Sequence, residues 1–388
     1  MMDSVELFTG CGGLALGLSR AGFTPRRMSE WDKHSVANIE SNRSKGVKPF
    51  DQWPIQEEDV QTVDWSAYSG ADLVAGGPPC QPFSIGGLHR GHDDKRDMWP
   101  ETVRAVREIR PRAFLFENVR GLLRPAFEQY LKWVLFSLSN PEIEIYRGES
   151  RSAHLRRLEA KNAVPSYHVK LFQVNAADYG AAQKRHRVII MGLDRDSNEW
   201  PAAPHPTHTR ERLMWDKWVT GDYWRRHGLK KPRTIPSADE PLVERLLNQS
   251  LIAPNSKPWT TVRDAIHGLG DPGTREDISN HSCQLGARSY PGHTGSILDE
   301  PAKALKAGVH GVPGGENMMA FENGKVRYFT VREAARLQGL PDKYEFIGSW
   351  SENMRQLGNA VPTPLAEVFA NRIAAYVSKS TRKPRVAA

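Results

Sequence analysis

Short apolar runs alternate with segments of helical periodicity in the first half of the chain. The runs at 72–75 and 113–116 show no polar alternation, which is typical of strands buried on both faces of a parallel sheet. We expect strands at 5–8, 72–75, 113–116, 169–174 and 188–192, and helices at 14–21 and 99–109. This order predicts a doubly wound α/β sheet.

The pattern changes after residue 193. Residues 195–325 are rich in Pro, Gly, His and Trp and contain few periodic segments. Periodicity returns at Thr330, which is placed to cap a helix, and a last helix is expected at 363–377. We therefore predict an α/β domain at 1–194, an irregular insert at 195–325, and a return to the first domain at 326–388. Residues 139–166 are polar without a clear core face, so we expect a surface excursion there.

The composition narrows the class of protein only moderately. A chain of 388 residues can bury one large core and a second smaller one. It has no apolar run of membrane-spanning length, and its first residues do not resemble a signal peptide, so we expect no membrane association and a cytoplasmic protein. Its three cysteines follow no metal-ligand spacing, which predicts neither a disulfide framework nor a metal site. The net charge of +8 favours a polyanionic partner, although only weakly.

Two features of the N-terminal half are typical of a nucleotide-type cofactor site. The turn from Phe8 to Gly13 joins a strand to a helix, and its glycines allow close backbone approach to a ligand. Glu30, at the end of the next strand, is placed to accept hydrogen bonds from ribose hydroxyls, and Trp31 offers a flat face for an adenine or a sulfonium. Asp59 is either an acceptor for an adenine amino group or a solvated surface carboxylate. Such turns are also common as purely structural elements.

Three further segments carry candidate chemistry. Cys80 lies on a proline-flanked loop after the strand at 72–75, so it is either a nucleophile at the sheet edge or a small buried side chain. Glu117 directly follows the strand at 113–116, where it is placed either at the mouth of the sheet or as a turn cap. Arg185 and Arg187 are two residues apart at a strand start, so they are expected to point to one side. A solvated basic edge is the alternative for this pair.

Taken together, these segments resemble the DNA cytosine-5 methyltransferase family of the bacterial restriction-modification type. The similar motifs occur in the family's order and outside the insert: ELFTGCGG, GGPPCQPFS, ENV, QKRHR, TVREAARLQGLPDKY and RQLGNAVP. The resemblance implies a Rossmann-like S-adenosyl-L-methionine-dependent methyltransferase fold. It also implies a smaller target-recognition domain inserted before the C-terminal helices.

The resemblance assigns a role to each chemical segment. Cys80 becomes the nucleophile, and Glu117 contacts the target cytosine at N3 and its amino group. Arg187 contacts the base O2, and Arg185 supports the site. Cofactor-lining positions fall at Phe8, Gly10, Cys11, Gly12, Gly13, Glu30, Trp31, Asp59, Val60, Pro79, Trp99, Asn359 and Ala360. Trp99 and Ala360 depart from the residues most common there.

This chemistry explains the residue types. Cytosine C5 is a poor nucleophile, and addition of a thiolate at C6, with N3 held by a carboxylic acid, makes it an enamine-like carbon. A stacked duplex prevents that attack, so the base must rotate out into the site.

The insert corresponds to the region that selects the target sequence. It contains five of the eleven tryptophans, most of which we expect in its core. The Gly-rich segment 302–315 is the better candidate for a groove-entering loop, with Ala304-Leu305 at the family's Thr-Leu position. We expect DNA contacts from Gln81, Ser84, Lys303, Lys306 and His310.

Two alternatives share the scaffold: a transfer RNA cytosine-5 methyltransferase and a catalytically inactive DNA-binding regulator. The large insert and the Cys-Gln-Pro sequence favour DNA over tRNA, and the intact Cys80, Glu117 and arginine pair argue against an inactive protein. We expect a monomer that binds double-stranded DNA, associates with the nucleoid through it, and is functionally paired with a restriction endonuclease.

Overall fold

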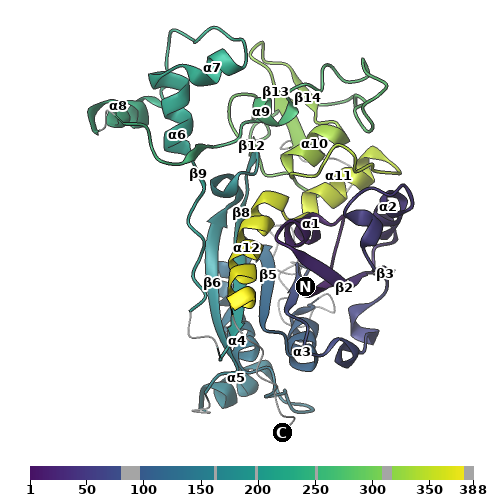
Figure 1. Ribbon diagram of the computed structural model, residues 1–388. Coiled ribbons are helices and arrows are strands. Elements are labelled where there is room, and N and C mark those ends of the chain that lie inside the picture. The colour runs from purple at the N-terminus through teal and green to yellow at the C-terminus, as the bar shows by residue number, and fades with distance from the viewer. Residues whose placement is uncertain (80–96, 161–163, 197–199, 250–251, 308–316, 380–388) are drawn as a thin grey trace. The chain divides into compact units, whose positions relative to one another are not determined.

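The computed structural model describes residues 1–79, 97–160, 164–196, 200–249, 252–307 and 317–379 (Figure 1). Contacts within the chain divide it into two compact units. Unit 1 comprises residues 1–174, 186–204 and 343–388, and unit 2 comprises residues 175–185 and 205–342.

Unit 1 is built on a seven-stranded sheet in the order β3-β2-β1-β4-β5-β8-β6. Its strands from β3 to β5 are parallel, and β8 runs antiparallel to β5. Their bounds are β1 (Met2–Leu7), β2 (Phe23–Glu30), β3 (Ile55–Glu57), β4 (Leu73–Gly76), β5 (Ala113–Val119), β6 (Tyr167–Asn175) and β8 (His186–Asp194). All five strands expected from the sequence are present, which confirms the doubly wound α/β sheet.

Helices cover both faces of this sheet. The larger core cluster joins side chains of β1, β4, β5 and β8 to those of α3, α4 and α5 on one face. On the other face α12 contacts β1 and β5 and packs against α1 (Figure 1). The helices of unit 1 are α1 (Gly13–Arg20), α2 (Lys33–Ser44), α3 (Trp99–Ile109), α4 (Glu128–Ser139), α5 (Arg151–Ala160), α11 (Trp350–Asn359) and α12 (Thr363–Lys379).

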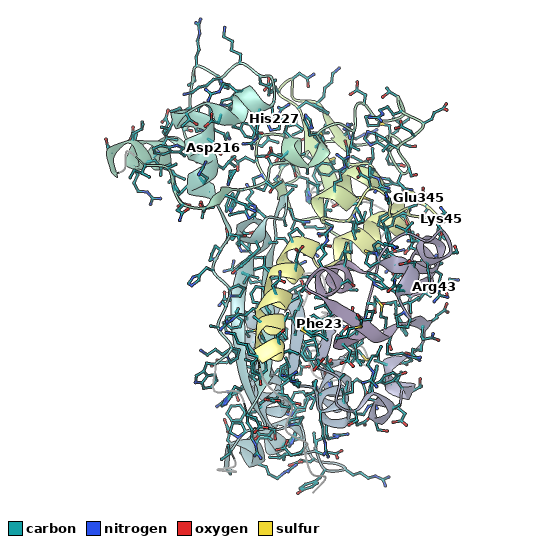
Figure 2. The ribbon with its side chains drawn as sticks, viewed as in Figure 1. Phe23, Arg43, Lys45, Asp216, His227 and Glu345 are labelled. Atoms are coloured by element: carbon teal, nitrogen blue, oxygen red, sulfur yellow. The ribbon has the colours of Figure 1, made fainter. Side chains whose placement is uncertain are left out.

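The C-terminal part of unit 1 is fitted closely to its N-terminal part. A Cβ atom on Gly17 would stand 2.5 Å from the Cβ of Ala366, so only glycine lets α1 approach α12 this closely. At the end of α2, Asn42 Nδ2 donates to the carbonyl of Glu345 (2.7 Å), and its Oδ1 accepts from the Glu345 N–H (2.9 Å). Lys45 forms an ion pair with the Glu345 carboxylate (Figure 2). The last segment of the chain therefore packs against the first segment within unit 1.

One expectation for unit 1 is wrong. Residues 139–166 are not only a surface excursion, because α5 contributes Leu155 and Leu158 to the larger core cluster. His154 is also buried, accepts from the Trp133 indole N–H (3.0 Å), and bonds the carbonyl of Ile143 (2.8 Å). Two leucines three residues apart are enough to bury one side of a short helix whose other positions are mostly polar.

Unit 2 consists of short elements. Its strands are β7 (Gln183–Lys184), β9 (His208–Thr209), β10 (Lys257–Pro258), β11 (Ser296–Ile297), β12 (Ala302–Lys303), β13 (Met318–Ala320) and β14 (Val326–Tyr328). Its helices are α6 (Arg210–Met214), the π-helix Trp215–Val219, α7 (Asp222–Arg226), α8 (Glu240–Gln249), α9 (Val262–Ile266) and α10 (Val331–Leu337).

Tryptophans form much of the core of unit 2. Trp215, Trp218 and Trp224 are buried in one cluster, and Trp259 packs against it. Trp200, in contrast, belongs to unit 1 and is 58% exposed. Most tryptophans of the insert are therefore core residues, as expected.

The helix α10 begins with a complete capping box. Thr330 Oγ1 accepts from the Glu333 N–H (3.1 Å), and the Glu333 carboxylate accepts from the Thr330 N–H (2.9 Å). This is the cap expected from the sequence. The helix packs against α9 within unit 2, whereas the sequence pattern assigns residues from 326 onward to the first domain.

Candidate active site

The glycine-containing turn after β1 adopts a backbone that few residues tolerate. Phe8, Gly10 and Gly12 have φ angles of 56°, 57° and 87°, in the left-handed region. A Cβ on Gly12 would stand 2.5 Å from the ring of Trp53, and one on Gly13 would stand 2.3 Å from the carbonyl of Val361. At Gly10 no other atom lies within 4 Å of such a Cβ. The turn therefore has no room for a side chain at Gly12 or Gly13 but has open space at Gly10.

Glu30 braces this turn from the end of β2. Its Oε2 accepts from the Gly10 N–H (2.7 Å), and its Oε1 accepts from the Asp32 N–H (2.8 Å). Burial raises the pKa of Glu30 above its ordinary value, and the N–H groups of Asp32 and Gly10 offset only part of that rise. The carboxylate is thus fixed, with lone pairs remaining on both oxygens.

The residues beside Glu30 differ in exposure. Trp31 is 77% exposed, which leaves its ring free to stack on a ligand. Asp32 caps α2 through the Ser35 N–H (3.1 Å) and pairs with Arg355 of α11 (2.7 Å). Asp59 accepts from the Gln61 N–H (3.0 Å) and caps a short 3-10 helix. The turn-capping role of Asp59 is therefore visible, and its role towards an adenine amino group stays a prediction.

Other expected cofactor positions lie in the core or on the surface. Trp99 is fully buried and meets Phe116 edge to face at 6.1 Å between ring centres. Cys11 is 1% exposed, and burial raises the pKa of its thiol to about 12, so it stays a neutral thiol. Val60 and Ala360 are buried, whereas Pro79 and Asn359 are exposed.

Glu117 and Arg187 form a buried ion pair at the end of β5 where β4 and β5 lead into their loops. Arg187 Nε lies 2.6 Å from Glu117 Oε1, and their side chains are 12% and 8% exposed. The strands bring them together because Val119 of β5 is opposite Arg187 of β8 in an antiparallel register. Arg187 Nη1 also donates to the carbonyl of His186 (2.8 Å).

The same strand end holds the segment that leads to Cys80. Asn118 Nδ2 donates to the carbonyl of Pro78 (3.1 Å), and Asn118 is 2% exposed. A Cβ on Gly77 would stand 3.8 Å from Glu117 Oε2, so the glycine at this position lies beside the carboxylate. Cys80 itself lies outside the described residues, as do Gln81, Ser84 and His310.

Arg185 forms a hydrogen bond to a segment of unit 2. It is 1% exposed, and its Nη1 donates to the carbonyl of Leu305 (2.8 Å). Arg187, in contrast, pairs within unit 1. The two arginines that the sequence groups together therefore contact different segments of the chain, at Leu305 and at Glu117. Lys303 is half-buried and donates to Thr294 Oγ1 (2.9 Å), and Lys306 is exposed.

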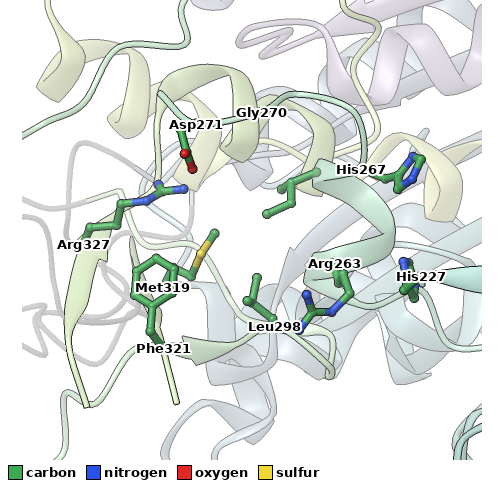
Figure 3. Close-up of a pocket in the computed structure, with 10 residues that line it drawn as sticks. His227, Arg263, His267, Gly270, Asp271, Leu298, Met319, Phe321 and Arg327 are labelled. Carbon is green, nitrogen blue, oxygen red and sulfur yellow. The ribbon is translucent and has the colours of Figure 1, made fainter. Parts of the chain in front are cut away.

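Unit 2 also contains an open cavity of about 290 Å³ (Figure 3). Leu298, Met319 and Phe321 line it together with charged groups. Arg263 pairs with Asp299 (2.6 Å) and Arg327 with Glu333 (2.6 Å). Because partners within unit 2 neutralise both guanidiniums, the cavity offers a ligand no unpaired arginine. It is not our candidate for the chemical site.

Within the described ranges, no helix is long and apolar enough to cross a membrane. In the same part of the chain, no group of three or more His, Cys, Asp or Glu side chains is arranged to hold a metal ion.

Comparison with known proteins identifies one family. The sequence profile described as C-5 cytosine-specific DNA methylase matches residues 2–375. The Type II methyltransferase M.NgoMIV of Neisseria gonorrhoeae is 30% identical over 385 residues, which cover 97% of this chain and 98% of that protein. The Type II methyltransferase M.FnuDI of Fusobacterium nucleatum is 30% identical over 382 residues, covering 96% of this chain and 94% of that protein.

Solved structures resemble the fold. The S. pombe Dnmt2 methyltransferase matches with a TM-score of 0.56 and 15% identity, covering 98% of this chain and 99% of that one. A putative DNA modification methyltransferase from E. coli matches with a TM-score of 0.53 and 22% identity, covering 98% and 100% of the two chains. At these identities the likeness supports the methyltransferase fold and nothing more specific.

Proposed function

Because the chain belongs to the C-5 cytosine-specific DNA methylase family and is a DNA cytosine-5 methyltransferase, we propose a specific reaction for it. The protein transfers a methyl group from S-adenosyl-L-methionine to C5 of a cytosine that is flipped out of a short duplex sequence. The observation that carries this proposal is the Glu117–Arg187 pair beside Gly77 and Pro78, the residues that lead to Cys80.

The residues around the glycine turn fit an adenosyl cofactor. The open space at Gly10 admits a ligand, the fixed Glu30 carboxylate retains lone pairs for ribose hydroxyls, and the exposed Trp31 ring offers a stacking face. We assign the holding of the cofactor to these residues, with Phe8 and Gly12 shaping the turn. When bound, S-adenosyl-L-methionine supplies an electrophilic methyl group on a sulfonium.

Cys80 is the nucleophile in this proposal. Its thiolate sulfur forms a bond to C6 of the cytosine while the C5–C6 double bond shifts its electrons to C5. Among the other cysteines, Cys11 is a buried neutral thiol at the cofactor turn, so it does not compete for this role. After methylation, loss of the C5 proton restores the double bond and expels the Cys80 thiolate.

Glu117 and Arg187 stabilise the base during this addition. Glu117 binds N3 and the amino group, and holding a proton at N3 disperses the negative charge that thiolate addition places on the ring. Arg187 donates to the base O2, and its fixed positive charge favours the same charge build-up. Both side chains are mostly withdrawn from water, which strengthens these interactions.

The substrate is double-stranded DNA, and residues 195–325 select its sequence as a target-recognition domain. The catalytic domain comprises 1–194 and 326–388. We further propose that the enzyme works in the cytoplasm beside a restriction endonuclease of the same specificity, as expected for relatives named Type II methyltransferases. Bisulfite sequencing of DNA from cells that express the protein will identify the methylated cytosine and its sequence context.

A direct assay separates this proposal from the tRNA alternative. Labelled S-adenosyl-L-methionine is incubated with the protein and either duplex DNA or tRNA. We expect label in the duplex only, and label in tRNA alone would overturn the DNA assignment. Cys80→Ser is expected to abolish transfer while DNA binding stays measurable, because serine lacks a comparably nucleophilic anion. Continued turnover by Cys80→Ser would remove this residue from the mechanism.

A further inference from the structure

Side chains, rather than a neighbouring strand, hold the backbone of Leu305 and Lys306. The Leu305 N–H donates to Gln183 Oε1 (3.4 Å), and the Leu305 carbonyl accepts from Arg185 Nη1 (2.8 Å). The Lys306 N–H donates to Asn317 Oδ1 (2.9 Å), and the Lys306 carbonyl accepts from Asn317 Nδ2 (2.8 Å). Both polar backbone groups of two consecutive residues are thus bound by three side chains of unit 2.

These three side chains are themselves fixed. None of them is more than 1% exposed. Gln183 Nε2 donates to two oxygens at the end of α10, at 3.1 and 3.0 Å. This leaves Gln183 Oε1 to accept from the Leu305 N–H. The carbonyl of Asn317 accepts from the Phe329 N–H (2.9 Å), so the β13–β14 hairpin holds the backbone of Asn317. The holding groups therefore form a rigid frame.

Residues 302–306, which we call the strip, begin in β12. Ala302 and Lys303 pair with Gln183 and Lys184 of β7 in a parallel register. The Lys303 N–H donates to the Ser296 hydroxyl (3.0 Å). The backbone of the strip is thus bound at Ala302, Lys303, Leu305 and Lys306. The side chains of Lys303 and Lys306 extend from this fixed backbone.

We propose that Asn317, assisted by Gln183 and Arg185, is a positioning residue for DNA sequence recognition. This inference rests on the proposed function. Asn317 acts through the backbone of Lys306: it fixes the direction in which residues 303–306 meet the duplex, and so fixes which base pairs are accepted. Neither the methyl-transfer chemistry nor cofactor binding depends on it. Arg185, which the sequence groups with Arg187, belongs by its contact with Leu305 to this frame.

The Asn317 hydrogen bonds restrict the positions that the strip can adopt. Loss of the Asn317 amide removes the partner that bonds both the N–H and the carbonyl of Lys306, and the strip relaxes to satisfy these groups elsewhere. Discrimination between base pairs depends on donors held in one geometry, so a strip that samples several positions loses it. Binding through phosphates tolerates such movement better, because it carries no sequence information.

The test compares Asn317→Ala with Thr330→Ala. Both substitutions remove a buried polar side chain of unit 2 that bonds the backbone, but Thr330 caps α10 and does not contact the strip. For each protein we would measure kcat and KM on the preferred duplex and on duplexes that differ from it by one base pair. The affinity for S-adenosyl-L-methionine and the melting temperature are measured alongside.

We expect Asn317→Ala to lower the ratio of kcat/KM between preferred and altered duplexes by about tenfold or more. The affinity for the cofactor should stay within about twofold of the parent, and Thr330→Ala should keep the parental ratio despite a lower melting temperature. Asn317→Asp keeps an acceptor for the Lys306 N–H but loses the donor, so it should give an intermediate ratio. If Asn317→Ala does not fold, the ratio measured for Asn317→Asp decides the question.

Three results would overturn the inference. The ratio could remain parental in a folded Asn317 variant, it could fall equally in Thr330→Ala, or kcat could fall alike on every duplex. The unsubstituted protein is assayed first. If it transfers no methyl group to any duplex, the proposed function itself fails; if it does transfer and only the Asn317 result disagrees, the function stands and the positioning role is rejected.

Discussion

Arg187 Nε lies 2.6 Å from Glu117 Oε1, and the two groups form an ion pair at the end of β5. The two side chains come from adjacent strands, and little of either one is exposed. Burying such a pair costs desolvation energy. Removing one member alone strongly destabilises the fold, because the other charge stays buried without its partner. In the reaction we propose, this pairing holds both groups in an orientation that a cytosine can share.

Glu117→Gln should lower the single-turnover rate of methyl transfer by about 10²- to 10⁴-fold, because glutamine cannot supply a proton at N3. It retains an acceptor for Arg187, so the fold should survive. Glu101→Gln is the matched control, since Glu101 forms a partly exposed ion pair with Arg104 on α3. The control rate should stay within about twofold of the parent. A fast Glu117→Gln enzyme would exclude Glu117 from the chemistry.

Asn118→Ala should reduce kcat by roughly tenfold, because the Pro78 carbonyl loses its buried donor two residues before Cys80. The KM values for DNA and cofactor should change less. Asn140→Ala is the control: Asn140 is also buried in unit 1 and donates to a carbonyl, that of Phe136 (3.2 Å). Equal losses in both variants would mean that the effect is a general one on stability.

The affinity for S-adenosyl-L-methionine should weaken as the pH falls, at a pH above the one at which an ordinary glutamate takes up its proton. Burial raises the pKa of Glu30, so this carboxylate takes up its proton at a higher pH than an ordinary glutamate with its value of 4.5. The neutral acid has lost its charge and one acceptor for the ribose. Titration calorimetry between pH 8 and pH 5 checks this trend, and Glu30→Gln should bind weakly with a flatter pH profile. A parental profile in Glu30→Gln would contradict this assignment.

The buried Glu6 side chain should make the free energy of unfolding depend on pH. It lies near the end of β1, accepts from the Ser4 hydroxyl (3.1 Å), and its Oε2 has no hydrogen-bond partner among the described residues. Burial raises the pKa of Glu6 from 4.5 to about 8. Between these values the unfolded chain releases the proton while the folded chain keeps it, so the free energy of unfolding falls as the pH rises through this window.

Glu6→Gln removes that dependence. The difference in melting temperature between Glu6→Gln and the parent should therefore shift in favour of the variant from pH 5 to pH 8. The underlying change in the free energy of unfolding is up to about 5 kcal/mol. Glu57→Gln, at an exposed position of β3, should show no such trend. A pH-independent difference for Glu6→Gln would show that Glu6 is ionised in the folded protein.

Periodic segments were predictable from the sequence, and side-chain contacts to the backbone were not. The helix expected at 99–109 is α3, Trp99–Ile109, because its apolar positions recur at helical spacing. The burial of α5 depends on partners such as Trp133, which is distant in sequence, so no local pattern reveals it. Asn118 and Asn317 bind carbonyl groups, and a sequence does not show where a carbonyl group will lie.

The candidate site divides in the same way. Motif order located Glu117 and Arg187, and the structure places them in contact. The same motifs grouped Arg185 with Arg187, although Arg185 bonds the Leu305 carbonyl in unit 2. The spacing of two residues sets which side of a strand a residue occupies, but it does not set which segment will pack there.

The close fit of α1 to α12 has a consequence for the time at which the protein becomes active. The ribosome makes the glycine turn and α1 long before α12, which packs against α1. Residues 350–379 complete the surroundings of Gly13 and Gly17, so a nascent chain that lacks them has an unfinished cofactor site. The protein is thus expected to bind its methyl donor only after α12 has been made, and chains that stop before residue 350 should not methylate DNA.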